Sequence, residues 1–458
     1  MTLIKSISGI RGTIGGEQGS NLTPIDVVEC TAGFGMWIKK RHSNPKVVIG
    51  RDGRITGKMV SQLATQTLLA MGIDVIDLDL STTPTVEYAV PIENASAGII
   101  FTASHNPKQW NALKFLNHKG EFISAADGEE ILEFIAEGKL HFNEVDKLGS
   151  YTSNDTYIQK HIEAILALPY VNVEAIKKKK FKVVVDCINS TGAISVPPLL
   201  EQLNCEVLLI NEEIHGNFAH NPEPRPEHLK ELSQMVKDNN ADLGISIDPD
   251  VDRLAFVCED GSMFGEEYTL VAVADSILHK KKGNTVSNLS STRALADVTK
   301  KHGGSYSASA VGEVNVVTMM KETNAVIGGE GNGGVILPDL HYGRDALAGI
   351  ALMLDLLANR DISMTALLAT YPQYKIVKDK ISLPEGLDVD QKLKELENQI
   401  TEGTINNIDG LKIDFEDGWV HMRKSNTEPI IRVYSEALTV EKAQELADQL
   451  KAKFQTLL

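Results

Sequence analysis

The chain has 458 residues, 42% of them hydrophobic and 23% charged, which is the composition of an ordinary globular protein with about three or four domains. Its formal net charge of −17 argues against non-specific binding to nucleic acid or to an anionic membrane surface, so neither is expected as a partner. The sequence has no signal-like N-terminus and no apolar run of about 18 residues, and its four cysteines are scattered, so we expect reduced thiols and a cytoplasmic location.

Arg11 is the first candidate for ligand binding along the chain. It stands between Gly9 and Gly12, which would let a loop present one guanidinium group to a ligand, although a plain turn with an exposed arginine has the same pattern. A helix is predicted to follow over residues 24–40, because Thr23 can cap it and a proline suits its first position.

A pattern of apolar strands alternating with helices then appears three times. The copies extend from the first strand to the last over residues 46–101, 181–247 and 285–327. Strands and helices that alternate at these lengths favour mixed or parallel sheets that are covered on both faces. We therefore expect three related α/β units. Each one ends its last strand with an unusual polar loop, which suggests three walls of one cleft.

The pattern changes after Pro372. The elements predicted there are a polar strand at 374–381, a charged helix at 389–399, strands at 411–415, 419–423 and 430–434, and a closing helix at 440–454. Asp417-Gly418 is a typical hairpin turn between two of the strands. This arrangement predicts a smaller α+β domain.

The polar loop of the first unit places Ser104 directly after a buried strand. Residues 102–107, Thr-Ala-Ser-His-Asn-Pro, follow the apolar run 97–101. In α/β sheets, ligands bind outside the carboxyl ends of the strands. A serine in such a turn more often caps a helix or bonds to the backbone, so this loop alone is weak evidence. Lys114, a little further on, is either a charge partner for the serine or a surface lysine.

The polar loop of the second unit is the strongest single motif. Residues 248–253, Asp-Pro-Asp-Val-Asp-Arg, place Asp248, Asp250 and Asp252 at alternate positions, so their carboxylates can converge. Three carboxylates with nothing between them would repel one another, and hard oxygen ligands suit Mg²⁺. The motif therefore predicts a magnesium site, with a solvated acidic turn as the alternative.

Two further loops have the composition of ligand-binding segments. Residues 330–334, Glu-Gly-Asn-Gly-Gly, would let the backbone approach a ligand closely while Glu330 and Asn332 bind sugar hydroxyls, or they form only a tight turn. Residues 423–432 join two predicted strands and form either an anion cradle or a hairpin with exposed cations. The cradle residues would be Arg423, Ser425, Asn426, Thr427 and Arg432.

Together these loops resemble those of the α-D-phosphohexomutase superfamily, which includes phosphomannomutase/phosphoglucomutase and phosphoglucosamine mutase. The resemblance covers essentially the whole chain. The family's serine, metal, sugar and phosphate loops correspond in order to residues 102–107, 248–253, 329–334 and 423–432. These four segments keep those names below.

The resemblance implies an α/β fold with four domains around a central cleft, three of them related α/β/α domains with mixed sheets and the last a smaller α+β domain. The domain ranges expected are 1–150 with the serine loop, 151–255 with the metal loop, 256–371 with the sugar loop and 372–458 with the phosphate loop. The expected oligomeric state is a monomer or a homodimer.

The resemblance also implies the reaction, in which hexose 6-phosphate and hexose 1-phosphate interconvert through a phosphoserine enzyme and a sugar 1,6-bisphosphate. Phosphorylated Ser104 would hand its phosphoryl group to the sugar. One Mg²⁺ would bind Asp248, Asp250, Asp252 and Ser104, and glucose or glucosamine 1,6-bisphosphate would be the activator. The catalytic candidates are Ser104, Arg11, Lys114 and His105. The phosphosugar would be bound by Arg253, Glu330, Asn332, Gly333 and the cradle residues of the phosphate loop.

The sugar loop departs from the commonest bacterial form of the family, Glu-x-Ser-Gly-His, because Asn332 and Gly334 replace the serine and the histidine. An acid/base histidine from this loop is therefore missing. The Glu-x-Asn-Gly-Gly form resembles archaeal-type phosphoglucosamine mutases, which implies glucosamine phosphate as substrate for UDP-N-acetylglucosamine and cell-wall precursor synthesis. Phosphomannomutase/phosphoglucomutase is the alternative. A phosphosugar hydrolase and a non-catalytic sugar-phosphate sensor are weaker alternatives.

Overall fold

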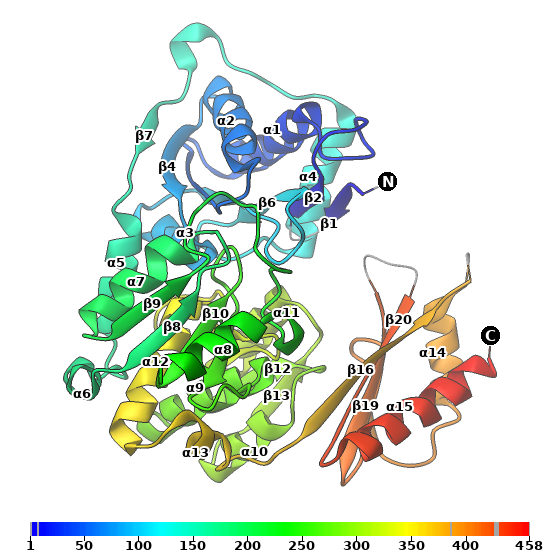
Figure 1. Ribbon diagram of the computed structural model, residues 1–458. Helices are drawn as coiled ribbons and strands as arrows, with labels where there is room; N and C mark the ends of the chain where they lie inside the picture. The colour runs from blue at the N-terminus through cyan, green and yellow to red at the C-terminus, as the bar shows by residue number, and fades with distance from the viewer. Residues whose placement is uncertain (1, 7–8, 385–386, 426–429, 458) are drawn as a thin grey trace.

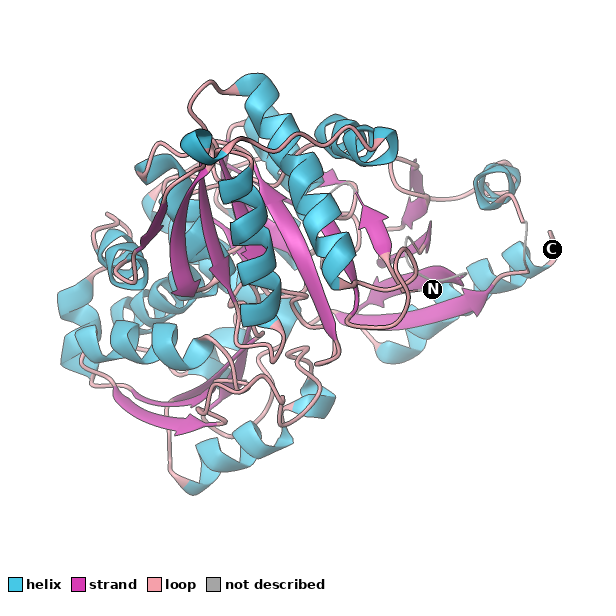
Figure 2. Cartoon of the chain, turned by 90° about the horizontal axis from the view of Figure 1, so that it is seen from above, coloured by secondary structure: helices cyan, strands magenta, loops and turns pink. Residues whose placement is uncertain are grey.

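The computed structural model describes residues 2–6, 9–384, 387–425 and 430–457 and consists of four units, each built on its own sheet (Figure 1). The sheets contain seven, four, four and five strands in chain order. In Figure 2, helices lie beside the strands of the large N-terminal part, and the C-terminal strands and helix extend to one side. This architecture confirms the predicted fold class.

The bounds of the elements follow the predicted alternation. The first unit contains β1 (Ile4–Ser6), β2 (Gly9–Thr13), α1 (Pro24–Arg41), β3 (Lys46–Arg51), α2 (Gly57–Ala70), β4 (Asp74–Leu80), α3 (Thr83–Ile92), β5 (Ala97–Phe101), β6 (Trp110–Leu116), α4 (Ala125–Glu137) and β7 (Tyr151–Ser153). The second contains α5 (Tyr157–Leu166), α6 (Val173–Lys179), β8 (Lys182–Asp186), α7 (Gly192–Gln202), β9 (Glu206–Ile210), α8 (Lys230–Asp238), β10 (Leu243–Ile247) and β11 (Leu254–Cys258). The third contains α9 (Glu266–Lys280), β12 (Asn284–Asn288), α10 (Ala294–Lys301), β13 (Tyr306–Ser309), α11 (Glu313–Thr323), β14 (Ala325–Glu330), β15 (Gly334–Ile336), α12 (Ala346–Arg360) and α13 (Met364–Leu368). The fourth contains β16 (Lys375–Ser382), α14 (Val389–Glu397), β17 (Thr404–Asn406), β18 (Leu411–Asp414), β19 (Gly418–Lys424), β20 (Ile430–Ala437) and α15 (Val440–Gln455).

The first three units share one connectivity. In each, three parallel strands are linked by helices, and a fourth strand then returns antiparallel to the third. The order within the sheet is the same in every unit: returning strand, third strand, first strand, second strand. The returning strands are β6, β11 and β15. The turn before each of them is therefore at the same corner of each unit.

Two expected domain boundaries need correction. Residue 150 was expected to end the first unit, but β7 follows it and pairs in parallel with β4 of the first sheet. Residue 255 falls inside β11, which pairs with β10 along its whole length. The first unit therefore extends to at least Ser153 and the second to at least Cys258, because a boundary does not divide a hydrogen-bonded sheet.

The start of the first helix follows from local capping. The predicted N-terminal helix is α1, where the Thr23 backbone N–H donates to Asp26 Oδ2 at 3.0 Å and the Asp26 N–H donates back to Thr23 Oγ1. A pair of this kind satisfies donors that a helix start leaves free. The first helix of the chain therefore begins at the predicted residue.

Helix α12 connects the cores of the second and third units. Every residue from Ala346 to Leu357 is buried, so this part of the helix has no exposed face. Its side chains belong to one apolar cluster that includes strands of both units, whereas the fourth unit has a separate cluster between its sheet and α15. The second and third units thus form one packed body.

Two other expectations concern thiols and membranes. Cys30, Cys187 and Cys258 are buried and unpaired, and Cys205 is unpaired and partly buried. Within the described part of the chain, every helix is too short or too polar to cross a bilayer.

Replacing Leu352, which lies fully buried in the middle of α12, by alanine should lower the free energy of unfolding by about 2–5 kcal/mol, because the shared core cannot close the cavity. Urea unfolding followed by circular dichroism measures this. Leu438→Ala is the control, since Leu438 is 60% exposed and should change stability by less than about 0.5 kcal/mol. Equal losses in the two variants would contradict the assignment of this core.

Candidate active site

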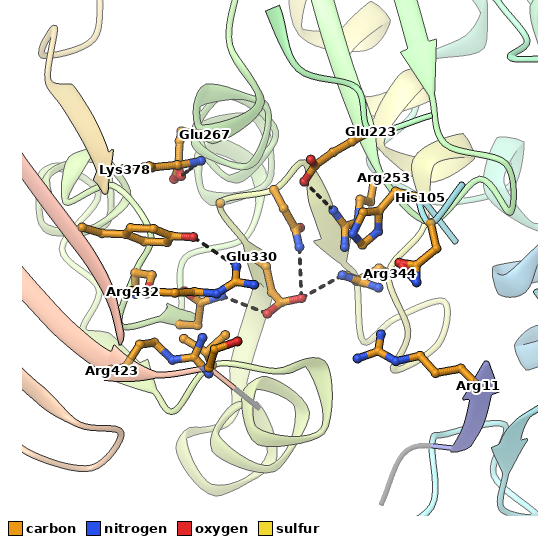
Figure 3. Close-up of a pocket in the computed structure, with 18 of the residues that line it drawn as sticks. Arg11, His105, Glu223, Arg253, Glu267, Glu330, Arg344, Lys378, Arg423 and Arg432 are labelled. Atoms are coloured by element: carbon orange, nitrogen blue, oxygen red, sulfur yellow. Dashed lines mark hydrogen bonds and ion pairs between the residues drawn. The ribbon is translucent and has the colours of Figure 1, made fainter. Parts of the chain in front are cut away.

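The four predicted loops converge on one cleft (Figure 3). The serine, metal and sugar loops each precede the returning strand of their unit, so they occupy equivalent positions. The cleft has a volume of about 660 Å³ and is lined by residues of all four units, among them Arg11, Arg253, Glu330 and Arg423. An adjoining cleft of about 460 Å³ reaches Ser104. Volumes of this size are typical of small-molecule sites.

Ser104 is held in a left-handed backbone conformation with φ of 48°, which is uncommon for a residue with a side chain. Its N–H donates to Thr102 Oγ1 at 2.9 Å. Its own Oγ donates to Asp248 Oδ2 at 2.7 Å, although the two residues are far apart in the sequence. The serine loop and the metal loop are therefore in direct contact.

The serine loop is fixed by Arg54, which follows β3. The Arg54 guanidinium donates to the backbone carbonyls of Ser104, Asn106, Pro107 and Trp110. Asp52 pairs with Arg54 Nε at 3.0 Å and accepts a hydrogen bond from Thr102 Oγ1 at 2.7 Å. Asp52 and Arg54 are both buried. Because a single planar guanidinium group donates hydrogen bonds to four backbone carbonyls, the serine loop has little freedom to move.

The metal loop buries its three carboxylates completely. Asp248, Asp250 and Asp252 are each 0% exposed, and one oxygen from each lies within 4.8 Å of the others. Asp248 Oδ1 accepts the backbone N–H groups of Asp252 and Arg253 at 3.1 and 3.0 Å, which curls the loop around this carboxylate.

Two groups of the first unit stabilise the charge of Asp250. Lys114 Nζ lies 2.8 Å from Asp250 Oδ2 and 3.8 Å from Asp252 Oδ2. Thr83 Oγ1 donates to the same oxygen of Asp250 at 2.6 Å. Because Lys114 is on β6, the returning strand of the serine unit, the metal loop depends on the neighbouring unit for its countercharge.

Arg344 connects the metal loop with the sugar loop. Its Nη2 lies 2.6 Å from Asp252 Oδ2, its Nη1 lies 2.8 Å from Glu330 Oε2, and its Nε lies 3.0 Å from Glu313 Oε2. One nearly buried guanidinium thus pairs with three carboxylates from separate segments. Loss of this cation would remove an ion-pair partner from all three carboxylates in a dry environment.

The charges in this cluster shift the pKa values in opposite directions. Burial raises the pKa of Asp248 well above its usual range, and Asp252 and Asp250 raise it further. Burial also acts to raise the pKa of Asp250, but the Lys114 ammonium outweighs it and holds this pKa below its usual range. Burial lowers the pKa of Lys114, yet Asp250 and Asp252 raise it overall, so Lys114 stays protonated at neutral pH.

The carboxylate cluster fits a divalent cation. Asp250 Oδ1 and Asp252 Oδ1 are buried and have no hydrogen-bond donor among the described residues. A buried carboxylate oxygen without a partner is costly, and three carboxylates around one point are hard oxygen ligands of the kind Mg²⁺ prefers. Asp248, Asp250 and Asp252 therefore form a suitable donor set.

The sugar loop brings Glu330 to the cleft, at the end of β14. Glu330 Oε1 accepts from Asn288 Nδ2 at 2.9 Å and from the Gly312 N–H at 3.2 Å, and Oε2 pairs with Arg344. Burial acts to raise the pKa of Glu330, but Arg344 outweighs it and lowers this pKa overall. The carboxylate is thus ionised and fixed before any ligand binds.

The turn of the sugar loop requires glycine at position 333. Gly333 has φ of 87°, and a Cβ there would lie 2.1 Å from the carbonyl oxygen of Leu254. Asn332 lines the cleft and accepts the Gly334 N–H at 3.2 Å. The loop is shorter than predicted, because Glu330 ends β14 and Gly334 begins β15.

Both arginines of the phosphate loop lie on strands. Arg423 is on β19 and Arg432 on β20, in agreement with the predicted strands 419–423 and 430–434, and they are directly opposite each other in the sheet. Both line the cleft together with Ser425. Arg423 Nε donates to Asp409 Oδ2 at 3.1 Å. The predicted residues Asn426 and Thr427 lie outside the described residues.

The remaining predicted residues also border the cleft. Arg11 is on β2, and its buried Nε has no hydrogen-bond partner within the described ranges. His105 Nδ1 lies 3.3 Å from Ser104 Oγ, and burial lowers the pKa of this imidazole well below its usual value. Arg253 Nη1 lies 3.5 Å from Glu223 Oε1.

Sequence reasoning missed several residues that hold the site, namely Asp52, Arg54, Thr83, Glu313 and Arg344. A signal existed for Arg54, because Arg-Asp-Gly-Arg follows a buried strand of the repeat just as the predicted loops do. Arg344 gave no such signal, since it precedes a helix that the pattern did not predict.

Comparison with known proteins gave matches along almost the whole chain. Models of the phosphoglucomutase/phosphomannomutase family match as alpha/beta/alpha domains I, II and III over residues 3–141, 159–261 and 265–374, and as the C-terminal domain over 377–453. A phosphoglucomutase/phosphomannomutase from Thermococcus kodakarensis is 36% identical over 442 residues, which is 95% of each chain. A probable phosphoglucosamine mutase from Methanopyrus kandleri is 34% identical over 446 residues, which is 96% of this chain and 95% of the other. The crystal structure of a phosphoglucomutase/phosphomannomutase family protein from Burkholderia thailandensis has a TM-score of 0.86 at 26% identity and covers 99% of this chain and 97% of its own.

Replacing Arg54 by lysine should keep the charge beside Asp52 but lose most of the bonds to the four carbonyls. We expect kcat to fall by up to about 100-fold with little change in KM, because the serine is misplaced and the substrate contacts remain. Steady-state kinetics measure both constants. Arg51→Lys is the matched control, since Arg51 pairs with the exposed Asp79. Equal kcat values in the two variants would contradict a positioning role for Arg54.

Proposed function

The chain belongs to the phosphoglucomutase/phosphomannomutase family and is a phosphohexomutase, and on this premise we propose that it interconverts glucosamine 6-phosphate and glucosamine 1-phosphate through phosphorylated Ser104. One observation carries the proposed mechanism: Ser104 Oγ lies 2.7 Å from Asp248 Oδ2. This contact puts the nucleophile candidate beside the carboxylates that would hold the cation.

The proposed reaction has two phosphoryl transfers. In the first, the bond between Ser104 Oγ and phosphorus breaks, a new bond forms between phosphorus and a free sugar hydroxyl, and the hydroxyl proton passes to a base in the cleft. The resulting sugar 1,6-bisphosphate turns over, and the reverse step returns the other phosphate to Ser104. Such transfers depend mainly on positioning and on stabilisation of charge.

Asp248, Asp250 and Asp252 would hold Mg²⁺, with the phosphoryl group of Ser104 as a further ligand. When bound, the ion supplies positive charge that stabilises the phosphoryl group in transfer. The unpaired Oδ1 atoms of Asp250 and Asp252 support this assignment.

We assign proton transfer to residues next to Ser104. Lys114 stays protonated beside Asp250, so it suits a role as proton donor or fixed cation at Ser104 Oγ. His105 is a neutral imidazole 3.3 Å from the same oxygen, so it suits a role as proton acceptor. Arg11 would add a positive charge from β2, the strand that pairs with the Lys114 strand β6. These three would together replace the histidine that the sugar loop lacks.

The rest of the cleft would bind the sugar and its non-reacting phosphate. Glu330, Asn332 and the Gly333 backbone would contact ring hydroxyls in both orientations of the substrate. Arg253 and the phosphate loop would bind the phosphate, since Arg423 and Arg432 are opposite each other on paired strands and both line the cleft. Ser425 lines the cleft beside them and would add a donor, as would Asn426 and Thr427 of the same loop.

The choice of glucosamine phosphate is supported by the Glu-x-Asn-Gly-Gly form of the sugar loop and by the name of the Methanopyrus relative. The Thermococcus relative is named for glucose and mannose phosphates, so that activity remains the alternative.

We also propose glucose or glucosamine 1,6-bisphosphate as activator and the cytoplasm as location. For the four domains we propose the expected ranges, with the first two extended as the sheets require.

A side-by-side assay with glucosamine, mannose and glucose phosphates tests the substrate. With a trace of glucose 1,6-bisphosphate present, we expect kcat/KM for glucosamine 6-phosphate to exceed that for the other two sugars by at least about tenfold. A preference for mannose or glucose phosphate would replace this substrate with the alternative. Net release of inorganic phosphate would contradict the mutase mechanism and favour a hydrolase.

Replacing Asp250 by asparagine tests the cation site at nearly constant shape. We expect kcat to fall by about two orders of magnitude or more, because the cation loses a charged ligand at the reacting group. Asp260→Asn is the control. Asp260 is exposed and follows β11, at the end of the β10–β11 pair opposite the metal loop, so this variant should have wild-type activity. Activity that survives in Asp250→Asn and no longer requires Mg²⁺ would overturn the assignment.

A further inference from the structure

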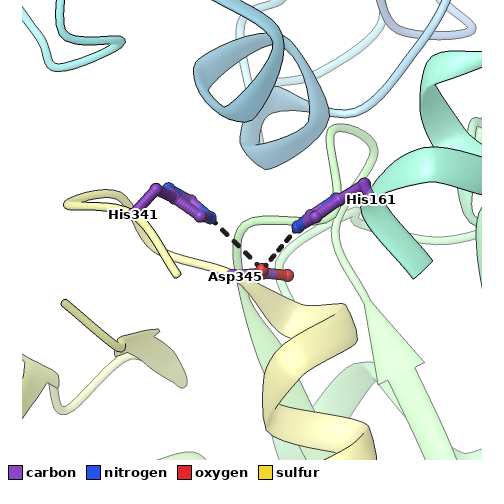
Figure 4. Close-up of side chains that lie close together, drawn as sticks. All are labelled: His161, His341 and Asp345. Atoms are coloured by element: carbon purple, nitrogen blue, oxygen red, sulfur yellow. Dashed lines mark hydrogen bonds and ion pairs between the residues drawn. The ribbon is translucent and has the colours of Figure 1, made fainter. Parts of the chain in front are cut away.

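A second group of metal-ligating side chains lies where the first three units meet (Figure 4). His161 is on α5 of the second unit, while His341 and Asp345 come from the segment that leads into α12 of the third unit. Their nearest neighbours Thr85 and Glu87 are on α3 of the first unit. His161 is 0% exposed, His341 8% and Asp345 1%, so the group is buried away from the cleft.

The three side chains point their donor atoms at one place. His161 Nε2 lies 3.0 Å from Asp345 Oδ2, and His341 Nε2 lies 3.2 Å from the same oxygen. All three atoms are within 4.8 Å of one another. Ligands at roughly 2.0–2.2 Å from a tetrahedral zinc ion are about 3.3 Å from each other, so the two nitrogen–oxygen distances match such an ion.

The group has too few N–H donors for the carboxylates around it. A neutral imidazole has a single N–H, so His341 can serve Asp345 through Nε2 or Glu87 through Nδ1, but not both. His341 Nδ1 lies 3.4 Å from Glu87 Oε2, and neither that nitrogen nor either oxygen of Glu87 has a hydrogen bond to any described residue. With Glu87 ionised, either tautomer therefore leaves a nitrogen lone pair facing a buried carboxylate.

A cation between the two Nε2 atoms and Asp345 Oδ2 removes this conflict. Both imidazoles can then carry their proton on Nδ1, where His161 faces Thr85 Oγ1 at 3.1 Å and His341 faces Glu87. Metal-bound histidines usually donate their second N–H to a carboxylate or another oxygen in this way. The arrangement of Thr85 and Glu87 thus matches the surroundings of a metal-bound histidine pair.

The charge of the group indicates a divalent ion. Asp345 and Glu87 carry two negative charges when ionised, and Arg344 and Lys114, the cations acting on Glu87, are already paired with carboxylates of the active site. One added proton leaves a buried negative charge, whereas a divalent ion brings the total to zero.

We propose that His161, His341 and Asp345 form a second cation site, separate from the magnesium site, that binds a borderline transition metal ion such as Zn²⁺. Imidazole ligands select such ions over Mg²⁺. With three protein ligands the ion keeps one further position for a water molecule.

The bound ion would link the second and third units through its ligands, and the first unit through the hydrogen bonds of Thr85 and Glu87. Asp345 also caps α12, since its Oδ1 accepts the Ala348 N–H at 3.1 Å. The preceding residue is Arg344, the cation that connects the metal loop with the sugar loop. The bound ion would thus hold the start of α12 and the backbone of Arg344 in place.

Metal titration of the full chain tests the proposal. The protein is freed of metal with a chelator, returned to excess Mg²⁺ and titrated with Co²⁺, then with Zn²⁺. We expect one Co²⁺ per chain with a strong visible absorption band typical of tetrahedral nitrogen ligation, full displacement by one Zn²⁺, and a higher melting temperature for the zinc form. Asp250→Asn should bind Co²⁺ in the same way, because the magnesium site is not involved.

Variants assign the ligands. His341→Asn and His161→Asn should each abolish the absorption band, and Glu87→Gln should weaken Co²⁺ binding by roughly 10- to 100-fold. His302→Asn is the matched control, since His302 pairs with Asp275 in the third unit without a second histidine at that carboxylate. It should bind Co²⁺ like the wild type.

Two outcomes would overturn the proposal. One is wild-type protein that takes up no stoichiometric Co²⁺ or Zn²⁺ in the presence of Mg²⁺, which would leave a proton as the neutralising charge. The other is an unchanged absorption band in both histidine variants. Because the readouts are metal content, absorption and melting temperature, they do not depend on which sugar phosphate the enzyme uses.

Discussion

The burial of three adjacent carboxylates is the constraint on which the rest of the site depends. Asp248, Asp250 and Asp252 are removed from water and have carboxylate oxygens within 4.8 Å of one another, which is strongly unfavourable unless positive charge surrounds them. The chain meets this requirement with side chains from other units, Lys114 from the first and Arg344 from the third. The charges that make the loop stable therefore also fix the three units around it, so the cleft and the cation site form together. Two carboxylate oxygens remain for the ion itself.

The serine, metal and sugar loops are each supported by a second polar loop, the one that follows the first of the three parallel strands of a unit. Arg54, after β3, holds the serine loop through its backbone carbonyls. Ser190, after β8, donates to the Pro249 carbonyl of the metal loop and accepts the Gly53 N–H from the first unit. Ser291, after β12, accepts the Gly331 N–H of the sugar loop. Supporting contacts of this kind keep reactive groups within a few tenths of an ångström of the geometry that transfer requires.

The sequence was sufficient for the parts of the fold that have a strong local pattern. Apolar strands followed by polar loops predicted the three related units, and alternating aspartates predicted a cluster of carboxylates, because both patterns depend on near neighbours. The returning strands β6, β11 and β15 were missed, since none of them has a regular alternation of apolar and polar residues. Helix α12 was missed because it is apolar on every face and so has no helical periodicity. Arg344 and the group around His161 depend on contacts between distant segments, and no pattern in one sequence predicts such contacts.

The identical strand order of the three α/β units has an evolutionary consequence. If one ancestral unit was duplicated twice, every copy arrived with its third strand, its returning strand and the turn between them already directed at a common centre. Divergence then needed only substitutions in that turn and in the turn after the first strand, while the apolar layers could stay as they were. The serine loop, the metal loop and the sugar loop could in this way arise from one ancestral turn, without a change in the backbone fold.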